Sequence, residues 1–346
     1  MVTFNNLFPR LITFQNLHAA CHEAAKGKKH TTSAADFLVH QEKEIFLLQR
    51  ELVNGTYRPG AYRTFELQEY SKKRKISAAP FRDRVIHHAF CQVVEPIFDP
   101  RFIYHSFACR TDKGTHLALK NCQQYVRLNS HVFQGDIVQY FASIHHRILL
   151  EILAKKIKDP RVMNLATLIV RSWHPKTGRG VPIGNLTSQF FANLYLNELD
   201  YFIKFHLRQK HYLRYMDDFL LFGQNKHELQ WCREVINVFL REKLALDLHP
   251  RKSLVYSRAV GVPFLGFRTF DRYRRVKPEN IKRFLKRIKK LKQQYQQNKI
   301  EFKALPEAVR RWINHARYGD TYCLRKSLFK QMIWRRRDVD SGSRPE

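Results

Sequence analysis

The chain has 346 residues, of which 62 are Lys or Arg and 30 are Asp or Glu, for a formal net charge of +32. Hydrophobic residues make up 44% of the chain, which excludes a disordered protein and allows a core that needs no disulfide bonds. Such an excess of positive charge opposes folding through self-repulsion, so it indicates a polyanionic partner, with nucleic acid favoured over ribosomal association or an anionic membrane surface.

The first part of the chain is predicted to be mainly helical. Residues 1–60 carry apolar positions at helical spacing, and an Asn-Gly pair ends the last of these helices. Residues 61–70 alternate in the manner of a strand. A helix then covers residues 83–95, and we expect Pro96 to stop it, because proline cannot donate the next helical hydrogen bond.

The rest of the chain alternates between strands and helices. The predicted segments are a strand at 132–137, helices within 145–172, a helix near 188–209 with Thr187 or Ser188 as N-cap, a hairpin at 212–222, a helix at 226–244, and a strand with a turn at 264–267. Residues 271–300 form a helical segment with 12 Lys plus Arg against 2 acidic residues. Solvated helices usually mix charges, so this segment indicates contact with nucleic acid. No apolar run could span a membrane and the N-terminus lacks a signal-peptide core, so we expect no membrane contact and a cytoplasmic location.

Three aspartates lie where predicted strands end. Asp136 follows one strand, and Asp217 and Asp218 separate two apolar runs that read as a tight hairpin. Asp136 and Asp217 are 81 residues apart, so they meet only if their strands are neighbours in one sheet. Nucleotidyl transfer uses two divalent cations, and Mg²⁺ prefers carboxylate oxygens held on rigid strands. In so basic a chain, these acids predict a site for two Mg²⁺ ions, with an ordinary solvated Asp-Asp turn as the alternative.

The segments around these aspartates resemble, in order, the motifs of reverse transcriptases. Tyr215-Met216-Asp217-Asp218 resembles the YxDD box, and Asp136 to Phe141 resembles the aspartate motif that precedes it. The other similar segments are Lys73 to Arg84, which resembles the fingers motif, and Leu246 to Lys252 and Phe264 to Phe267, which resemble the two motifs after the YxDD box. The resemblance covers about residues 60–270. It implies an RNA-directed DNA polymerase of α+β class with the right-hand fold, in which a palm carries a small antiparallel sheet.

The resemblance also implies a division into domains. The expected parts are an N-terminal helical extension or fingers at 1–60, fingers with the start of the palm at 61–130, the palm at 131–270, a helical thumb at 271–335 and a disordered tail at 336–346. The 79 residues after Phe267 leave room for a thumb and little else. We therefore expect other factors to remove the RNA strand and to install the DNA product.

Metal and nucleotide roles follow from the same resemblance. Asp136 and Asp217 would be direct metal ligands, with Asp218 completing the cluster and Ile137 beside them. Phe141, next to Tyr140, would lie under the incoming sugar and exclude a 2′-hydroxyl, unless it is a plain core aromatic. The remaining implied contacts are Arg74 to the triphosphate, helped by Lys73 and Lys75, and Lys252 as a candidate acid near the departing pyrophosphate. For these bases a solvated surface position is the alternative.

Template and primer contacts are implied in three places. Gln189 and the turn before it, which contains Ile183 and Gly184, would border the nascent base pair and the template. The further positions are Tyr215 and Met216 beside the primer end, Gly266 in the last motif, and Lys286, Arg287 and Lys290 on the basic helix. The helix would follow an RNA–cDNA hybrid by its shape and phosphates.

One motif resembles a narrower group. Ile183 to Gln189 contains Ser-Gln where group II intron enzymes usually carry Pro-Gln-Gly, and this form resembles the reverse transcriptases of diversity-generating retroelements, as do Cys109 to His116 and Trp312 to Ala316. That group copies a structured template-repeat RNA into cDNA from dNTPs, with errors at template adenines, and works with a small basic accessory protein that forms a helical-bundle oligomer. Two alternatives stay open: a retron-like or defence-associated reverse transcriptase, and a non-catalytic RNA-binding protein on a polymerase scaffold.

Overall fold

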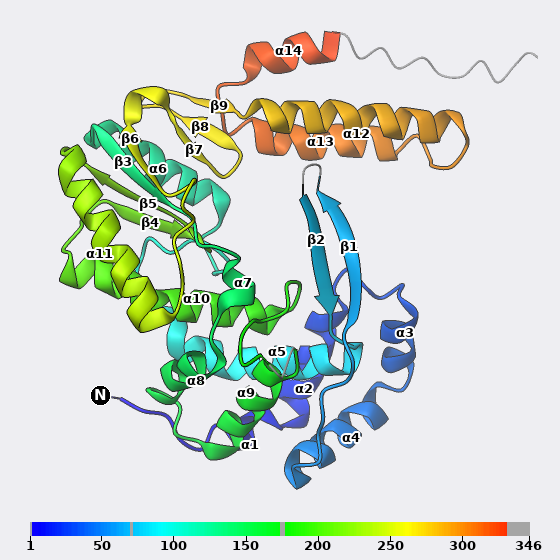
Figure 1. Cartoon of the computed structure of the whole chain (residues 1–346). Coiled ribbons are helices and arrows are strands. Elements are labelled where there is room, and N and C mark those ends of the chain that lie inside the picture. Colours follow the sequence, from blue (N-terminus) through cyan, green and yellow to red (C-terminus); the bar gives the residue numbers. More distant parts are fainter. Residues whose placement is uncertain (1, 70–71, 174–176, 331–346) are drawn as a thin grey trace, which may run out of the picture. The chain divides into compact units, whose positions relative to one another are not determined.

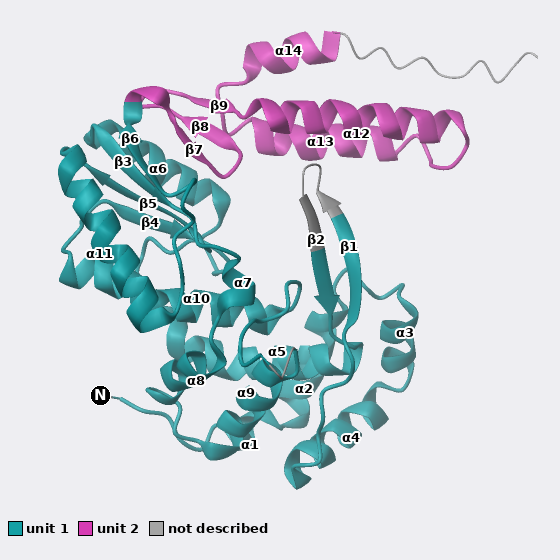
Figure 2. Ribbon diagram, in the orientation of Figure 1, with its two compact units in different colours: residues 1–258 teal, residues 259–346 magenta. Residues whose placement is uncertain are grey.

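The structure, a computed structural model, describes residues 2–69, 72–173 and 177–330, with the side chains of 68–74 outside that description. The chain divides into two compact units, residues 1–258 and residues 259–346 (Figure 2). The strands and turn near residue 264 therefore fall in the second unit rather than with the predicted palm. The tail at 336–346 lies outside the described residues.

Four helices precede the first strand, as predicted for residues 1–60. They are α1 (Phe8–Leu11), α2 (Phe14–Ala25), α3 (Thr32–Val39) and α4 (Gln41–Asn54). Helix α4 ends at Gly55, whose φ of 69° is left-handed, as the Asn-Gly pair predicted. Helices α1, α2 and α3 all pack against the longer helix α5 (Phe81–Phe98) (Figure 1). Their buried side chains join one hydrophobic core that continues into the rest of the first unit.

The prediction that Pro96 stops the fifth helix was wrong. Helix α5 contains Pro96 and ends only at Phe98, where a 3-10 turn (Asp99–Arg101) takes over. Proline in a helix removes one backbone hydrogen bond, and near the C-terminal end few turns remain for it to disturb. Packing supplies the compensation, because Val93, Val94 and Phe98 are all buried.

The centre of the first unit is a four-stranded antiparallel sheet. Its strands are β3 (His131–Gly135), β4 (Tyr212–Tyr215), β5 (Asp218–Gly223) and β6 (Leu254–Ser257), in the order β4-β5-β3-β6. Helix α11 (Lys226–Leu244) packs against β3, β5 and β6, while α6 (Thr115–Leu128) packs against β4 (Figure 1). The helix predicted at 226–244 is confirmed at both ends. The aspartate motif and the hairpin are therefore neighbours in one sheet, as the predicted metal site requires.

Helices α7 (Tyr140–Ser143), α8 (His146–Ala154), α9 (Pro160–Arg171) and α10 (Leu186–Tyr201) connect β3 to β4. Helix α10 begins earlier than predicted, with Asn185 rather than Thr187 or Ser188 at its N-cap. Both predicted caps are buried inside the helix. The α-helix also ends earlier than residue 209, because a π-helical turn (Phe202–His206) follows Tyr201.

Up to Lys330, the described part of the second unit contains a three-stranded antiparallel sheet and three α-helices. The strands are β7 (Val262–Phe264), β8 (Phe267–Thr269) and β9 (Arg274–Val276), followed by α12 (Pro278–Gln296), α13 (Ala304–Ala316) and α14 (Tyr322–Lys330). The predicted basic helix begins only at Pro278, so strand β9 was missed. Phe284 of α12 stacks on Trp312 of α13 with ring centroids 4.2 Å apart, which joins the two helices. Across the described ranges, no helix is both long and apolar enough to cross a membrane.

Candidate active site

The Asp-Asp pair belongs to the hairpin that joins β4 to β5. Tyr215 pairs with Asp218, so Met216 and Asp217 form a two-residue turn. Met216 has φ of 58°, and it is the residue of the two in the left-handed region. A positive φ at the first central residue is the pattern of a type II′ turn, whose twist suits a hairpin. The turn thus carries Asp217 and the start of β5 carries Asp218.

Strand β3 brings Asp136 to the same end of the sheet. Gly135 pairs with Phe219 of β5, so the next position of this antiparallel register sets Asp136 opposite Asp218. The residue at 135 must be small, because a Cβ there would lie 2.2 Å from the Phe219 ring. The sequence prediction that these aspartates come from neighbouring strands is therefore matched by the backbone.

The segment after α11 fixes the backbone of Asp136. Its carbonyl oxygen accepts hydrogen bonds from the His249 amide at 2.7 Å and from the Ser253 hydroxyl at 3.1 Å. Its amide donates to the same hydroxyl oxygen of Ser253 at 3.2 Å. Lys252, between these two residues, forms an ion pair through Nζ with Oδ2 of Asp136. The candidate acid is thus in direct contact with a predicted metal ligand.

Ile137 lies in an isolated antiparallel bridge with Leu248. The two hydrogen bonds around this bridge use the amide of Val138, at 2.9 Å from the Asp247 carbonyl, and the carbonyl of Asp136. Neither of them uses the carbonyl of Ile137. The side chain of Ile137 is buried, so only its backbone could serve a ligand.

A polar residue that the sequence did not single out contacts Asp218, and a second one contacts the first. The Gln134 amide donates to Oδ1 of Asp218 at 3.3 Å, and the Tyr256 hydroxyl donates to Oε1 of Gln134 at 2.9 Å. Gln134 precedes Asp136 by two residues, so strand alternation places both on one face of β3. This alternation is the sequence signal that could have identified Gln134. The contact with Tyr256 could not be identified in the same way, because it depends on the pairing of β3 with β6.

The three aspartates are of the type that could hold divalent cations. Three carboxylates at adjacent strand ends are the hard oxygen ligands that Mg²⁺ prefers. Within the described part of the chain, however, no three His, Cys, Asp or Glu side chains are gathered closely enough to hold a metal ion. The residues fit such ions in type and backbone position, while the carboxylate of Asp136 is engaged by Lys252.

The aromatic pair after Asp136 divides between core and surface. Tyr140 is buried and its hydroxyl donates to the Ala192 carbonyl at 2.5 Å. Burial raises the pKa of Tyr140 well above its usual range, so this phenol stays neutral. Phe141 is only half-buried, with its ring centroid 5.6 Å from that of Tyr140. Phe141 is therefore the member of the pair that retains an accessible surface.

The predicted triphosphate contacts lie on the hairpin of β1 (Arg63–Glu69) and β2 (Lys72–Ala78). Lys75 is exposed and its backbone pairs with Glu66. The side chains of Lys73 and Arg74 lie outside the described part of the structure.

The base of this hairpin is joined to the turn before α10. The Ser77 amide donates to the Ile183 carbonyl at 3.2 Å, and the Asn185 side chain donates to the Ser77 carbonyl at 3.3 Å. Gly184 between them has φ of 116° and is exposed. Gln189 is half-buried, one turn into α10. The structure thus brings the hairpin and the predicted template-bordering turn together.

The predicted primer and duplex contacts are divided between the two units. In the first unit, the Tyr215 hydroxyl lies 3.2 Å from Oγ1 of Thr115, and Met216 is half-buried in the turn between β4 and β5. In the second unit, Leu265 and Gly266 form the β7–β8 turn, both with positive φ. The three predicted bases of α12, all exposed, are Lys286, Arg287 and Lys290.

Comparisons with known proteins give a family match, relatives in sequence and a similar solved structure. Residues 66–269 match the family described as reverse transcriptase (RNA-dependent DNA polymerase). Protein YkfC of Escherichia coli strain K12 is 26% identical over 269 residues, which cover 65% of this chain and 71% of YkfC. The group II intron-encoded protein LtrA of Lactococcus lactis subsp. cremoris is 24% identical over 326 residues, which cover 74% of this chain and 54% of LtrA. A telomerase structure from Candida albicans aligns with 64% of this chain and 46% of that chain, at a TM-score of 0.47 and 11% identity.

A template-directed polymerase is the class of protein that the ordered motifs and the sheet define. The family match covers more than half of the chain, so this chain belongs to the reverse transcriptase family. The predicted enzyme class, RNA-directed DNA polymerase, is confirmed, and so is the α+β fold class of a right-hand polymerase with small antiparallel sheets. The family generally uses divalent metal ions. The chain spans about half the length of LtrA.

Proposed function

We propose that this chain copies an RNA template into cDNA by nucleotidyl transfer at Asp136, Asp217 and Asp218. The observation that carries the proposal is the register of the sheet, which sets Asp136 opposite Asp218 and puts Asp217 in the adjoining turn. A function that uses these acids together accounts for their positions at neighbouring strand ends in a chain of charge +32.

The protein's own groups would prepare this site for two Mg²⁺ ions. When bound by the three carboxylates and the Ile137 carbonyl, the ions would lower the pKa of the primer 3′-hydroxyl and neutralise charge on the triphosphate. Lys252, on the carboxylate of Asp136, holds that group in place and carries a proton at Nζ that the departing pyrophosphate can take. Gln134 orients the carboxylate of Asp218 from the other side.

The substrate would be selected by residues around this centre. Phe141, half-buried beside Tyr140, would contact the incoming sugar and disfavour a 2′-hydroxyl, so that dNTPs are used. Arg74, with Lys73 and Lys75, would hold the triphosphate. Ile183, Gly184 and Gln189 would border the template, which is consistent with the hydrogen bonds that join their turn to the base of the β1–β2 hairpin.

The Ser-Gln form of the segment from Ile183 to Gln189 supports assignment to a narrower group of reverse transcriptases. The chain would act in a diversity-generating retroelement, where it copies a structured template-repeat RNA with errors at template adenines, together with a small basic accessory oligomer. A retron-like or defence-associated enzyme would share the catalytic residues and differ in the RNA that it copies.

The test of the polymerase is cDNA synthesis on a primed RNA with Mg²⁺ and dNTPs. We expect Asp217→Ala/Asp218→Ala to lose activity by several orders of magnitude, since transition-state charge would lose its counterions. A matched control, Glu234→Ala/Glu242→Ala, removes two exposed carboxylates from α11 and should keep full activity. Equal activity in the aspartate variant and the wild type would overturn the assignment of the site.

The retroelement assignment needs its own comparison. The wild-type enzyme would be assayed on its own structured RNA, with and without the accessory protein, and the cDNA would be sequenced. We expect substitutions concentrated opposite template adenines and a strong dependence on both partners. Faithful copying of any primed RNA by the purified chain alone would instead favour a retron-like or defence-associated enzyme.

A further inference from the structure

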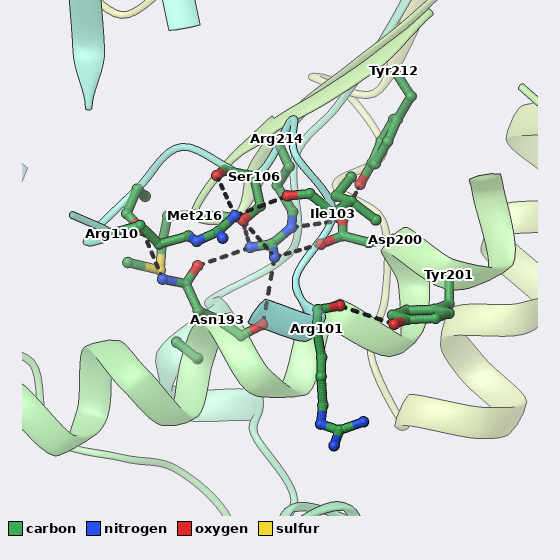
Figure 3. A network of polar contacts seen from close by, with 12 residues as sticks. Arg101, Ile103, Ser106, Arg110, Asn193, Asp200, Tyr201, Tyr212, Arg214 and Met216 are labelled. Carbon is green, nitrogen blue, oxygen red and sulfur yellow. Dashed lines mark hydrogen bonds and ion pairs between the residues drawn. The ribbon is translucent and has the colours of Figure 1, made fainter. Parts of the chain in front are cut away.

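A fully buried arginine lies directly before the catalytic box, and no catalytic role has been assigned to it above. Arg214 is in β4, and its side chain is 0% exposed. It forms an ion pair with Asp200 of α10, whose side chain is also 0% exposed, at 2.6 Å between Nη2 and Oδ2 (Figure 3). Burial lowers the pKa of Arg214, but the Asp200 carboxylate more than offsets this, so the net pKa is raised and the guanidinium stays charged.

The rest of the guanidinium is also bonded. Nε donates to Oδ1 of Asp200 at 2.8 Å, which makes the pair bidentate, and Nη1 donates to the Asn193 side-chain oxygen at 3.1 Å. Nη2 donates to the Ser106 hydroxyl at 3.1 Å (Figure 3). Asn193 is itself fixed, because its amide donates to the Ala108 carbonyl at 2.7 Å. The Arg214 guanidinium therefore forms hydrogen bonds both to helix α10 and to the loop that contains Ser106.

The same guanidinium reaches the catalytic turn. Nη1 of Arg214 donates to the backbone carbonyl of Met216 at 3.1 Å (Figure 3). Met216 is the residue of the turn with positive φ, a conformation that non-glycine residues adopt at a cost. The backbone of Arg214 is held as well, since its amide donates to the His105 carbonyl at 2.9 Å and its carbonyl accepts from the Phe107 amide at 3.0 Å.

Stability alone does not account for this arrangement. A buried ion pair costs desolvation energy, and well-packed apolar residues of similar volume are often as stabilising or more so. What an apolar replacement cannot supply is a directed hydrogen bond to the Met216 carbonyl, which sets the path of the chain into Asp217.

We propose that Arg214, held by Asp200 and Asn193, is a positioning residue that fixes the Met216-Asp217 turn in the conformation that binds divalent cations. The inference rests on the proposed function, because it assigns the turn to the metal site. A small displacement of a metal ligand is enough to impair catalysis severely, so rigid support beneath the turn has a direct chemical consequence.

The decisive variant removes the charges and keeps the packing. Arg214→Met/Asp200→Leu/Tyr212→Phe deletes the ion pair together with the Tyr212 hydroxyl, which donates to Asp200 at 2.7 Å and would otherwise lose its acceptor. Arg214→Lys keeps a charge but loses the bidentate geometry. Tyr212→Phe alone is the control, since it removes one hydroxyl from the network and leaves in place the bonds of Arg214 to the Met216 carbonyl and to the Asp200 carboxylate.

Two readouts separate positioning from stability. The thermal midpoint Tm reports stability, and Mn²⁺ titration of the full chain, followed by electron paramagnetic resonance, reports metal affinity without any need for activity. We expect the triple variant to keep a Tm near that of wild type but to bind Mn²⁺ about tenfold or more weakly. Its kcat should fall by a larger factor than its KM for dNTP changes. Arg214→Lys should lie between it and wild type, and Tyr212→Phe should match wild type in Mn²⁺ affinity.

The outcomes are distinct. Unchanged Mn²⁺ affinity in the triple variant would overturn the inference, as would a wild type that binds no Mn²⁺ at this turn. Weakened Mn²⁺ affinity in the variant, with a wild type that copies no RNA, would support the positioning role and count against the proposed function instead.

Discussion

At the scale of single residues, the ion pair between Lys252 and Asp136 makes two proposed roles of Lys252 separable. In the proposed function the ion pair holds the carboxylate, and the ammonium group serves as the acid for the departing pyrophosphate. Arginine could keep the ion pair but does not release its proton in proteins, so substitution at this position distinguishes the two roles.

We expect Lys252→Met to lower kcat on the order of a hundredfold, the scale typical of a lost general acid. Lys252→Arg should recover little of that loss, because it restores only the ion pair. Single-turnover incorporation rates at saturating dNTP give the comparison, with Lys243→Met, an exposed position on α11, as the matched control. Full activity in Lys252→Arg would limit the residue to an electrostatic role.

How far the sequence could predict the site also differs from residue to residue. Asp136 and the Asp217-Asp218 turn were predictable, because flanking apolar runs defined their strands. The contacts of Gln134 with Asp218 and of Arg214 with Asp200 were not, because each depends on strand register or on the rotation of α10. Neither quantity leaves a signal in residue spacing. The roles assigned to the site residues stay predictions until the variants are measured.

At the scale of elements, local sequence signals gave helix positions better than helix ends. The 226–244 helix was predicted at both ends, and in the structure Asn225 caps it and its last residue, Leu244, is buried. Helix α5 passes through Pro96 and α10 begins at Leu186, with Asn185 as its N-cap, because tertiary contacts there outweigh local preferences. Asn185, for example, uses its side chain on Ser77 and Ala79 rather than on its own helix.

Helix α5 also contains a buried histidine with a predictable effect on stability. Burial, with smaller contributions from His88 and Arg84, lowers the pKa of His87 to about 3, against an ordinary value near 6.5. Between these values the unfolded chain takes up a proton that the folded chain excludes. Stability is therefore complete above about pH 6.5 and falls as the pH decreases toward 3.

When the pH is lowered from 7.5 to 5, we expect the free energy of unfolding to fall by about 2 kcal/mol less in His87→Leu than in wild type. Urea midpoints at the two pH values provide the measurement. His227→Leu, which removes an exposed histidine from α11, is the control and should follow wild type. If His87→Leu showed the same acid sensitivity as wild type, the titrating group would have to be sought elsewhere.

At the scale of the whole molecule, the charge of +32 should appear in the salt dependence of nucleic-acid binding. Each phosphate contact adds close to one unit to the slope of log K against log salt concentration. The exposed bases of α12 are the candidates for part of that slope.

Replacement of Lys286, Arg287 and Lys290 by alanine should reduce the slope by about two to three for an RNA–DNA primer duplex. Fluorescence anisotropy over a series of salt concentrations measures it. Replacement of Lys26, Lys28 and Lys29, three exposed lysines after α2, removes the same charge and should alter the slope less. Equal effects of the two triple variants would indicate nonspecific electrostatic attraction rather than direct contact between α12 and the phosphates of the duplex.

The order in which the chain leaves the ribosome gives the sheet a last consequence. Strand β6 pairs with β3, and the hydroxyl that bonds the Asp136 backbone belongs to Ser253, 117 residues further along the chain. A nascent chain that has emerged only as far as Leu244 holds the acids and the hairpin, but β3 still has an unpaired edge. The complete sheet, with the Ser253 hydrogen bonds that hold the Asp136 backbone, can therefore form only late in translation, after β6 has been synthesised.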